Sequence, residues 1–61
     1  MAKSDITKIA LANSLKKLMN TTPFERITII DICGSAGISR RTFYQHFRDK
    51  FELLNWMFFK D

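Results

Sequence analysis

The chain has 61 residues, a hydrophobic content of 46% and a formal net charge of +4. This length allows one small domain, and the hydrophobic content excludes a chain that is disordered throughout. No apolar run approaches the roughly 18 residues of a membrane span, and one cysteine with one histidine makes neither an internal disulfide nor a zinc site. We therefore expect a cytosolic domain with no cofactor, metal or membrane partner, whose positive charge favours anionic partners.

An amphipathic pattern predicts the first helix, from a cap at Asp5 to about Met19. Its apolar residues recur at helical spacing and are expected to face the core: Leu11, Leu15, Leu18 and Met19. The segment NTTPFERI follows, and its Asn, Thr and Pro predict a loop. Within this loop we expect Phe24 and Ile27 to anchor the chain to the core.

Capping patterns predict a short second helix. Thr28 starts it, and Asp31 stands three residues later, as in a capping box. Gly37 ends it, because glycine tolerates the left-handed conformation that closes a helix. Gly34 lies inside the helix, where glycine costs about 1 kcal/mol relative to alanine, and a close helix crossing would explain its presence. Cys33 is expected to be a small core residue.

Ser39 caps a third helix that begins only two residues after the second one ends. Phe43 and Phe47 lie one turn apart and are expected to face the core. Asp49 caps a fourth helix, which starts at Lys50 and is apolar on nearly all sides. Together these elements predict an all-α fold: a homeodomain-like three-helix bundle with a helix-turn-helix, followed by the start of a fourth helix.

Two adjacent cations, Arg40 and Arg41, occupy the first turn of the third helix, where the backbone dipole disfavours positive charge. A solvated surface is the alternative explanation for such a pair. However, two short helices joined by a tight glycine-containing turn are typical of a helix-turn-helix. The second helix of that motif, here about residues 39–47, enters the DNA major groove. Phosphates that line the groove would supply the missing counter-charge, so the pattern favours DNA binding.

Side-chain chemistry separates the candidate DNA contacts. Arginine can bond to guanine and glutamine to adenine, which points to Arg40, Arg41 and Gln45 as base readers. Thr42 can touch a thymine methyl or a phosphate. Phosphate contacts are expected from the residues around the same helix that carry a hydroxyl or an ammonium, and from the free amides beside Thr28: Ser39, Tyr44 and Lys50.

Residues 27–54, ITIIDICGSAGISRRTFYQHFRDKFELL, resemble the DNA-binding signature of the TetR family of bacterial transcription regulators. The resemblance implies a DNA-binding head over residues 1–50 and, over residues 51–61, the start of a helix linking it to an absent ligand-binding and dimerisation domain. It also implies that Tyr44 is a groove residue and that Thr28, Ser39, Tyr44, His46 and Lys50 contact the DNA backbone. For His46 a structural role at the core edge is an equal alternative. Small residues or proline are common at the position of Arg41, which bears on the operator sequence rather than on DNA binding.

The resemblance further implies a homodimer on a near-palindromic operator, acting as a repressor under a small-molecule or protein effector. The terminal segments MAKSDITK and LLNWMFFKD resemble, more loosely, a subgroup of the family that includes the dihydroxyacetone-kinase operon regulator. In that subgroup the signal comes from a protein partner.

The aromatic end of the fourth helix is too apolar for so small a chain to cover. We expect Trp56, Phe58 and Phe59 to contact either the absent domain or another copy. The alternative function is therefore a protein-interaction module on the same fold. An enzyme is not expected, because no nucleotide loop, metal-binding spacing or catalytic triad is present in the sequence.

Overall fold

The computed structural model describes residues 3–59, which form four α-helices, one short 3₁₀ turn and no strand. The elements in chain order are α1 (Lys3–Met19), η1 (Phe24–Arg26), α2 (Ile29–Ala36), α3 (Arg40–His46) and α4 (Lys50–Phe59). The predicted all-α class, with a helix-turn-helix and a fourth helix behind it, is confirmed.

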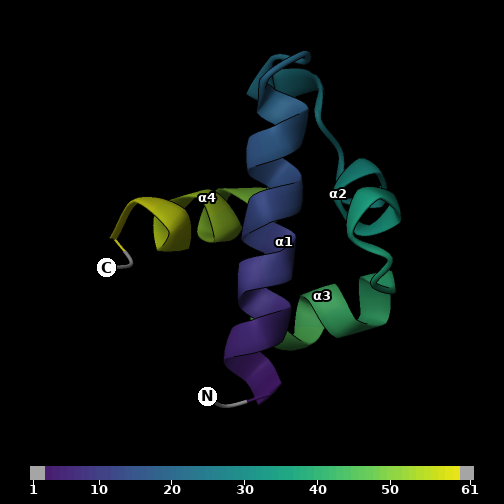
Figure 1. The fold of residues 1–61 in the computed structure, drawn as a ribbon, viewed down its shortest axis with the longest axis vertical. Helices are drawn as coiled ribbons and strands as arrows, with labels where there is room; N and C mark the ends of the chain where they lie inside the picture. The colour runs from purple at the N-terminus through teal and green to yellow at the C-terminus, as the bar shows by residue number, and fades with distance from the viewer. Residues whose placement is uncertain (1–2, 60–61) are drawn as a thin grey trace.

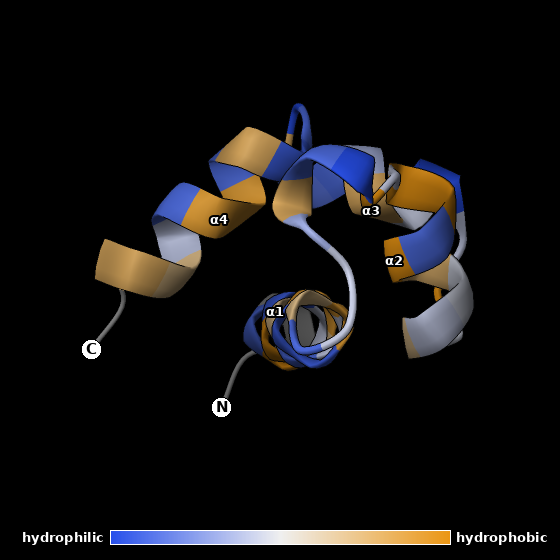
Figure 2. Cartoon of the chain, turned by 90° about the horizontal axis from the view of Figure 1, so that it is seen from above, coloured by the Kyte–Doolittle hydropathy of each residue, from blue (hydrophilic) through white to orange (hydrophobic). Residues whose placement is uncertain are grey.

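The longest helix, α1, organises the fold and runs along the long axis of the molecule (Figure 1). It contacts each of the other three helices. Viewed down its axis, α4, α3 and α2 lie in an arc on one side of α1 (Figure 2). The helix-turn-helix formed by α2 and α3 therefore rests on α1 from one side only.

One hydrophobic core holds the four helices together. Its members come from every α-helix and from the segments just before α2 and just after α3: Leu11, Leu15, Ile27, Ile32, Cys33, Phe43, Phe47 and Leu53. All are 5% exposed or less. The predicted anchors of the loop are confirmed, because Ile27 is buried and Phe24 packs against the core from outside.

A capping box fixes the start of α2, and a left-handed glycine fixes its end. The Thr28 hydroxyl accepts the Asp31 N–H at 3.1 Å, while the Asp31 carboxylate accepts the Thr28 N–H at 3.0 Å. Gly37 closes the helix in the left-handed conformation, with φ of 70°. Both predictions for this helix are confirmed, and the capping box satisfies two backbone donors that the helix itself leaves unpaired.

The predicted caps of the next two helices are also present. The Ser39 hydroxyl accepts the Thr42 N–H at 3.2 Å at the start of α3. At the start of α4, the Asp49 carboxylate accepts the Glu52 N–H at 2.9 Å. The Glu52 carboxylate reaches back to the Arg48 N–H at 2.9 Å. The start of α4 is thus fixed by two side-chain bonds.

Three details differ from the sequence-based expectations. Asp5 does not cap α1, because the helix begins at Lys3 and Asp5 lies within its first turn, where its charge complements the dipole. Gly34 is not at a close helix crossing, since a Cβ added there would meet no atom within 4 Å. Met19 is 38% exposed rather than part of the core, because it is the last residue of α1.

A buried hydrogen bond joins α1 to α2. The Ser14 hydroxyl, on a residue only 6% exposed, donates to the carbonyl oxygen of Ile32 at 2.7 Å. We expect Ser14→Ala to lower the free energy of unfolding by about 1 kcal/mol, the typical net value of one such bond. Urea unfolding followed by circular dichroism would measure it. The exposed Ser35 of α2 provides the control, and equal effects of Ser14→Ala and Ser35→Ala would show that the buried bond contributes nothing.

Candidate nucleic-acid interface

The outward face of α3 carries four of the predicted DNA contacts. Arg40, Arg41, Tyr44 and Gln45 are all exposed, while Phe43 on the opposite face is completely buried. The Tyr44 ring meets the Phe43 ring edge-on, with 5.5 Å between centroids, and the tyrosine remains 55% exposed. A buried phenylalanine thus anchors a short helix whose other face is free to contact a ligand.

The two arginines of this face have no fixed partner. Neither guanidinium forms a hydrogen bond or an ion pair within the described part of the chain. Their positive charge lies in the first turn of α3, where the helix dipole opposes it. The protein therefore leaves both cations uncompensated at this surface, and an anionic ligand would supply the compensation.

Two hydroxyls stand beside the arginines at the start of α3. Ser39 Oγ donates to Thr42 Oγ1 at 3.0 Å and accepts the Thr42 N–H at 3.2 Å. The Thr42 hydroxyl keeps its own proton for a further acceptor, because it acts here only as an acceptor. Both groups are thus held in place, and the Thr42 hydroxyl can donate to a phosphate oxygen, whereas Ser39 would first have to release its proton from Thr42.

A shallow groove brings together predicted residues from separate helices. Its lining comes from the start of α2, the outer face of α3 and the start of α4, and includes Thr28, Arg40, Tyr44 and Lys50. Arg40 also lines a second shallow groove between α2 and α3, together with Ser39. Arg40 therefore stands between the two hollows, at the centre of the candidate interface.

Two exposed hydrophobic residues are among those of the groove that the sequence analysis missed as candidates. Ile30 and Phe51 line it and are 62% and 61% exposed. A signal existed for Ile30, because it falls outside the apolar face that the other hydrophobic residues of α2 form. Both residues add apolar surface next to the polar groups. Such surface can contact the thymine methyl groups in the major groove of DNA.

Lys50 differs from the arginines because its charge already has partners. Its ammonium donates to the carbonyl oxygens of Phe24 and Ile27, each at 2.7 Å. The same nitrogen lies 4.5 Å from the centroid of the Phe24 ring. At most one of its three protons is left for a phosphate.

The structure places the other candidates away from this groove. His46 is partly buried in the last turn of α3. Trp56 is also partly buried, with its ring centroid 5.9 Å from that of Phe47. Phe58 and Phe59 are 72% and 82% exposed.

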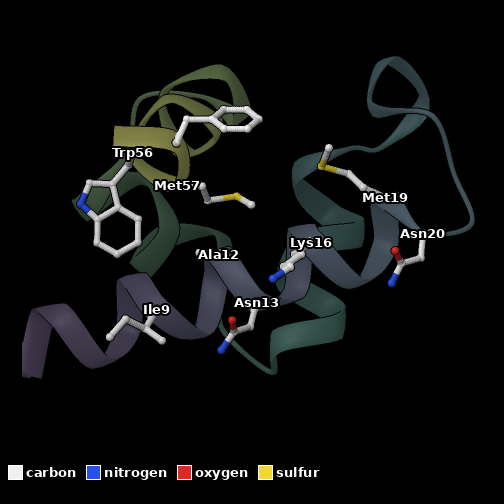
Figure 3. Close-up of a pocket in the computed structure, with 9 residues that line it drawn as sticks. Ile9, Ala12, Asn13, Lys16, Met19, Asn20, Trp56 and Met57 are labelled. Carbon is white, nitrogen blue, oxygen red and sulfur yellow. The ribbon is translucent and has the colours of Figure 1, made fainter. Parts of the chain in front are cut away.

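A groove between α1 and α4 contains part of the aromatic end. Figure 3 shows its two walls, with side chains of α4 facing side chains of α1: Trp56 and Met57 opposite Ile9, Ala12 and Lys16. Hydrophobic residues continue along α4 (Figure 2). The aromatic end is thus a second surface, separate from the one that α3 presents.

Cys33 has the environment expected of a core residue. It is 5% exposed, and burial raises the pKa of its thiol, an effect that the nearby charge of Arg40 partly offsets. A raised pKa keeps the sulfur protonated at neutral pH and so unreactive. Among residues 3–59 no group of three or more His, Cys, Asp or Glu side chains could hold a metal ion.

Comparison with known proteins agrees with the geometry. Residues 13–57 match the family model described as "Bacterial regulatory proteins, tetR family". A curated relative from Lactococcus lactis subsp. lactis (strain IL1403) is named "HTH-type dhaKLM operon transcriptional activator DhaS". The two sequences are 41% identical over 61 residues, which are the whole of this chain and 33% of the relative. The chain therefore spans about a third of the length of that relative. None of the helices that the structure describes is long and apolar enough to cross a membrane.

Proposed function

This chain belongs to the TetR family of bacterial regulatory proteins, and from that premise we propose that it binds operator DNA by inserting α3 into the major groove. It is a DNA-binding helix-turn-helix domain of a transcription regulator, and its family is not one of enzymes. The observation that carries the proposal is the pair of exposed arginines on the outward face of α3, which have no hydrogen-bond or ion-pair partner among residues 3–59.

The residues of α3 divide by what they can reach. Arg40 and Arg41 offer forked donors that match guanine, and Gln45 offers the amide pair that matches adenine. Tyr44 reaches the groove wall, and the methyl group of Thr42 suits a thymine methyl. These five side chains are proposed as the groove contacts.

A second set of residues is proposed to hold the DNA backbone. The hydroxyls of Thr28 and Tyr44 can donate to phosphate oxygens, and His46 can do the same from the end of α3. Ser39 can donate to a phosphate if its hydroxyl turns away from Thr42. The first amides of α2 have no partner inside the helix and lie next to Thr28. Lys50 lines the same groove as Thr28.

Residues 1–50 are proposed as the DNA-binding head and residues 51–61 as the start of a helix that continues to a further domain. The chain covers only a third of its relative, and Phe58 and Phe59 are left exposed. We propose that these two residues and Trp56 contact that further domain. Through it, two heads would meet the half-sites of a near-palindromic operator, under a small-molecule or protein effector.

Whether the regulator represses or activates transcription is a separate question from DNA binding. The family resemblance implies a repressor, whereas the relative is named as an operon activator. In both cases the head acts by bringing the regulator to its operator. The proposal is therefore operator binding, in a regulator that resembles one acting on a dhaKLM operon.

The dependence of affinity on salt tests the proposal. The chain, joined at its C-terminus to a parallel two-stranded coiled coil, would be titrated with duplex DNA by fluorescence anisotropy at several salt concentrations. Each neutralised phosphate changes the slope of log K against log salt by about −0.9, so we expect about −2 or steeper per head. Binding that does not respond to salt, or no binding at all, would contradict the proposal.

A further inference from the structure

Lys50, like the two arginines of α3, is a cation in the first turn of a helix. Unlike the arginines, it has hydrogen-bond partners within the domain. Lys50 is the first residue of α4, where the helix dipole disfavours a cation. Its ammonium is compensated internally by the carbonyl oxygens of Phe24 and Ile27, both at 2.7 Å. A charge that is already compensated has little to gain from a phosphate.

We propose that Lys50 is a positioning residue, whose ammonium ties the start of α4 to the η1 turn and so places the N-terminus of α2 for DNA binding. This inference rests on the proposed function and assigns Lys50 a role within that interface. It differs from the direct phosphate contact that the sequence analysis predicted for the residue.

The contacts around the ammonium form a clamp on the turn. Nζ lies 4.5 Å from the centroid of the Phe24 ring and 5.7 Å from that of Phe51. These two rings meet edge-on, with 5.2 Å between centroids. The cation therefore sits among aromatic rings and carbonyls, where hydrogen bonds from a charged donor are stronger than neutral ones.

The clamp acts at the residue that leads directly into α2. The Ile27 side chain is 1% exposed and fixed in the core, while its carbonyl oxygen is held by Lys50. The next residue, Thr28, is the cap of α2 and one of the proposed backbone contacts. Fixing the Ile27 peptide on both sides therefore sets where the Thr28 hydroxyl and the first amides of α2 point.

The clamp also joins two capped helix starts. The start of α4 is held by the bonds of Asp49 and Glu52, and the start of α2 by the bond pair of Thr28 and Asp31. Lys50 spans 23 residues of sequence to reach Ile27. A shift at the start of α4 would thus reach the DNA-facing end of α2 through the Lys50 side chain, beside the ring contact between Phe51 and Phe24.

Lys50→Met tests the inference, because methionine keeps a long unbranched stem and removes the ammonium. The DNA affinity of the coiled-coil-linked dimer would be measured at several salt concentrations, in conditions where circular dichroism shows both proteins folded. We expect a loss of about tenfold per head with an unchanged salt slope, the equivalent of about one hydrogen bond. Lys17→Met, which removes an exposed charge from α1, serves as the matched control.

Nuclear magnetic resonance of the free protein gives a readout that does not depend on DNA. Lys50→Met should shift the amide signals of residues 24–31 and leave those of residues 40–45 in place, whereas Lys17→Met should shift neither set. Global loss of stability alone would not produce this local pattern.

Two results would overturn the inference. A salt slope that falls in magnitude by about 0.9 per head, with the amides of residues 24–31 unmoved, would make Lys50 a phosphate contact. Unchanged affinity in Lys50→Met would show that the clamp does not matter for binding. If the parent protein itself does not bind DNA, the proposed function is wrong, and so is the role of Lys50 in DNA binding. The amide shifts would still show whether Lys50 holds the η1 turn.

Discussion

Replacing both arginines of α3, in Arg40→Ala with Arg41→Ala, is expected to lower the affinity of the dimerised protein for its operator by at least about 100-fold. A bidentate arginine–guanine contact is worth about 1–3 kcal/mol, and two heads would lose two arginines each. The side chains are exposed and make no hydrogen bond or ion pair within residues 3–59. Their removal therefore costs the folded protein little.

The expected loss of DNA affinity does not come from a loss of stability. Cations in the first turn of a helix oppose its dipole, so the double variant should be as stable as the parent or slightly more stable. Affinity would be measured by fluorescence anisotropy, and stability by urea unfolding of the same samples. If DNA affinity falls while the free energy of unfolding stays the same, the arginines act at the DNA interface.

The adjacent pair Lys16 and Lys17 on α1 provides a control with the same change in charge. Both residues are exposed, and neither lies on α2 or α3. Lys16→Ala with Lys17→Ala should weaken binding only slightly, through the net charge. If both double variants lose the same affinity, the protein binds DNA as a general polycation and the role given to α3 is wrong.

Phe43→Ala is expected to unfold the domain or bring it to the edge of unfolding. Phe43 is completely buried and packs against the rings of Tyr44 and Phe47. Truncation of a buried phenylalanine costs about 3–5 kcal/mol. At roughly 0.05–0.15 kcal/mol per residue, a chain of this length has only about 3–9 kcal/mol in total. Thermal unfolding followed by circular dichroism at 222 nm would show the loss.

Phe58, one of the exposed phenylalanines of α4, provides the control for Phe43→Ala. Phe58 is 72% exposed, so Phe58→Ala should change the free energy of unfolding by no more than about 0.5 kcal/mol. A Phe43→Ala protein that melts cooperatively within about 1 kcal/mol of the parent would show that α3 is not anchored as the structure indicates.

Features that depend on neighbouring residues were predictable from the sequence. The caps at Thr28, Ser39 and Asp49 and the left-handed turn at Gly37 involve groups three or four residues apart, and all four are present. The outward face of α3 also followed from its spacing, because Phe43 had to point inward. Helix-turn-helix geometry is largely made of such local rules, which explains why the family could be recognised.

Features that depend on how helices pack were not predictable. The hydrogen bond from Ser14 to α2 joins residues 18 apart in the sequence, and the bonds of Lys50 join residues 23 or more apart. No local sequence pattern predicts such contacts. A glycine inside a helix predicts a close helix crossing at Gly34, but a Cβ there would meet no atom within 4 Å, because the sequence shows the helical position and not the neighbours in space. Trp56 was expected at an outer surface, and only the packed structure shows its contact with Phe47.

Selection from random duplex DNA would show directly whether α3 reads an operator sequence. The protein linked as a dimer through a C-terminal coiled coil would be used to select duplexes over several rounds, with the Arg40→Ala, Arg41→Ala variant treated in parallel. We expect enrichment of an inverted repeat with half-sites spaced by about one helical turn or more, and its loss in the variant. If no sequence is enriched, or if the variant enriches the same repeat, α3 does not read operator DNA through its arginines.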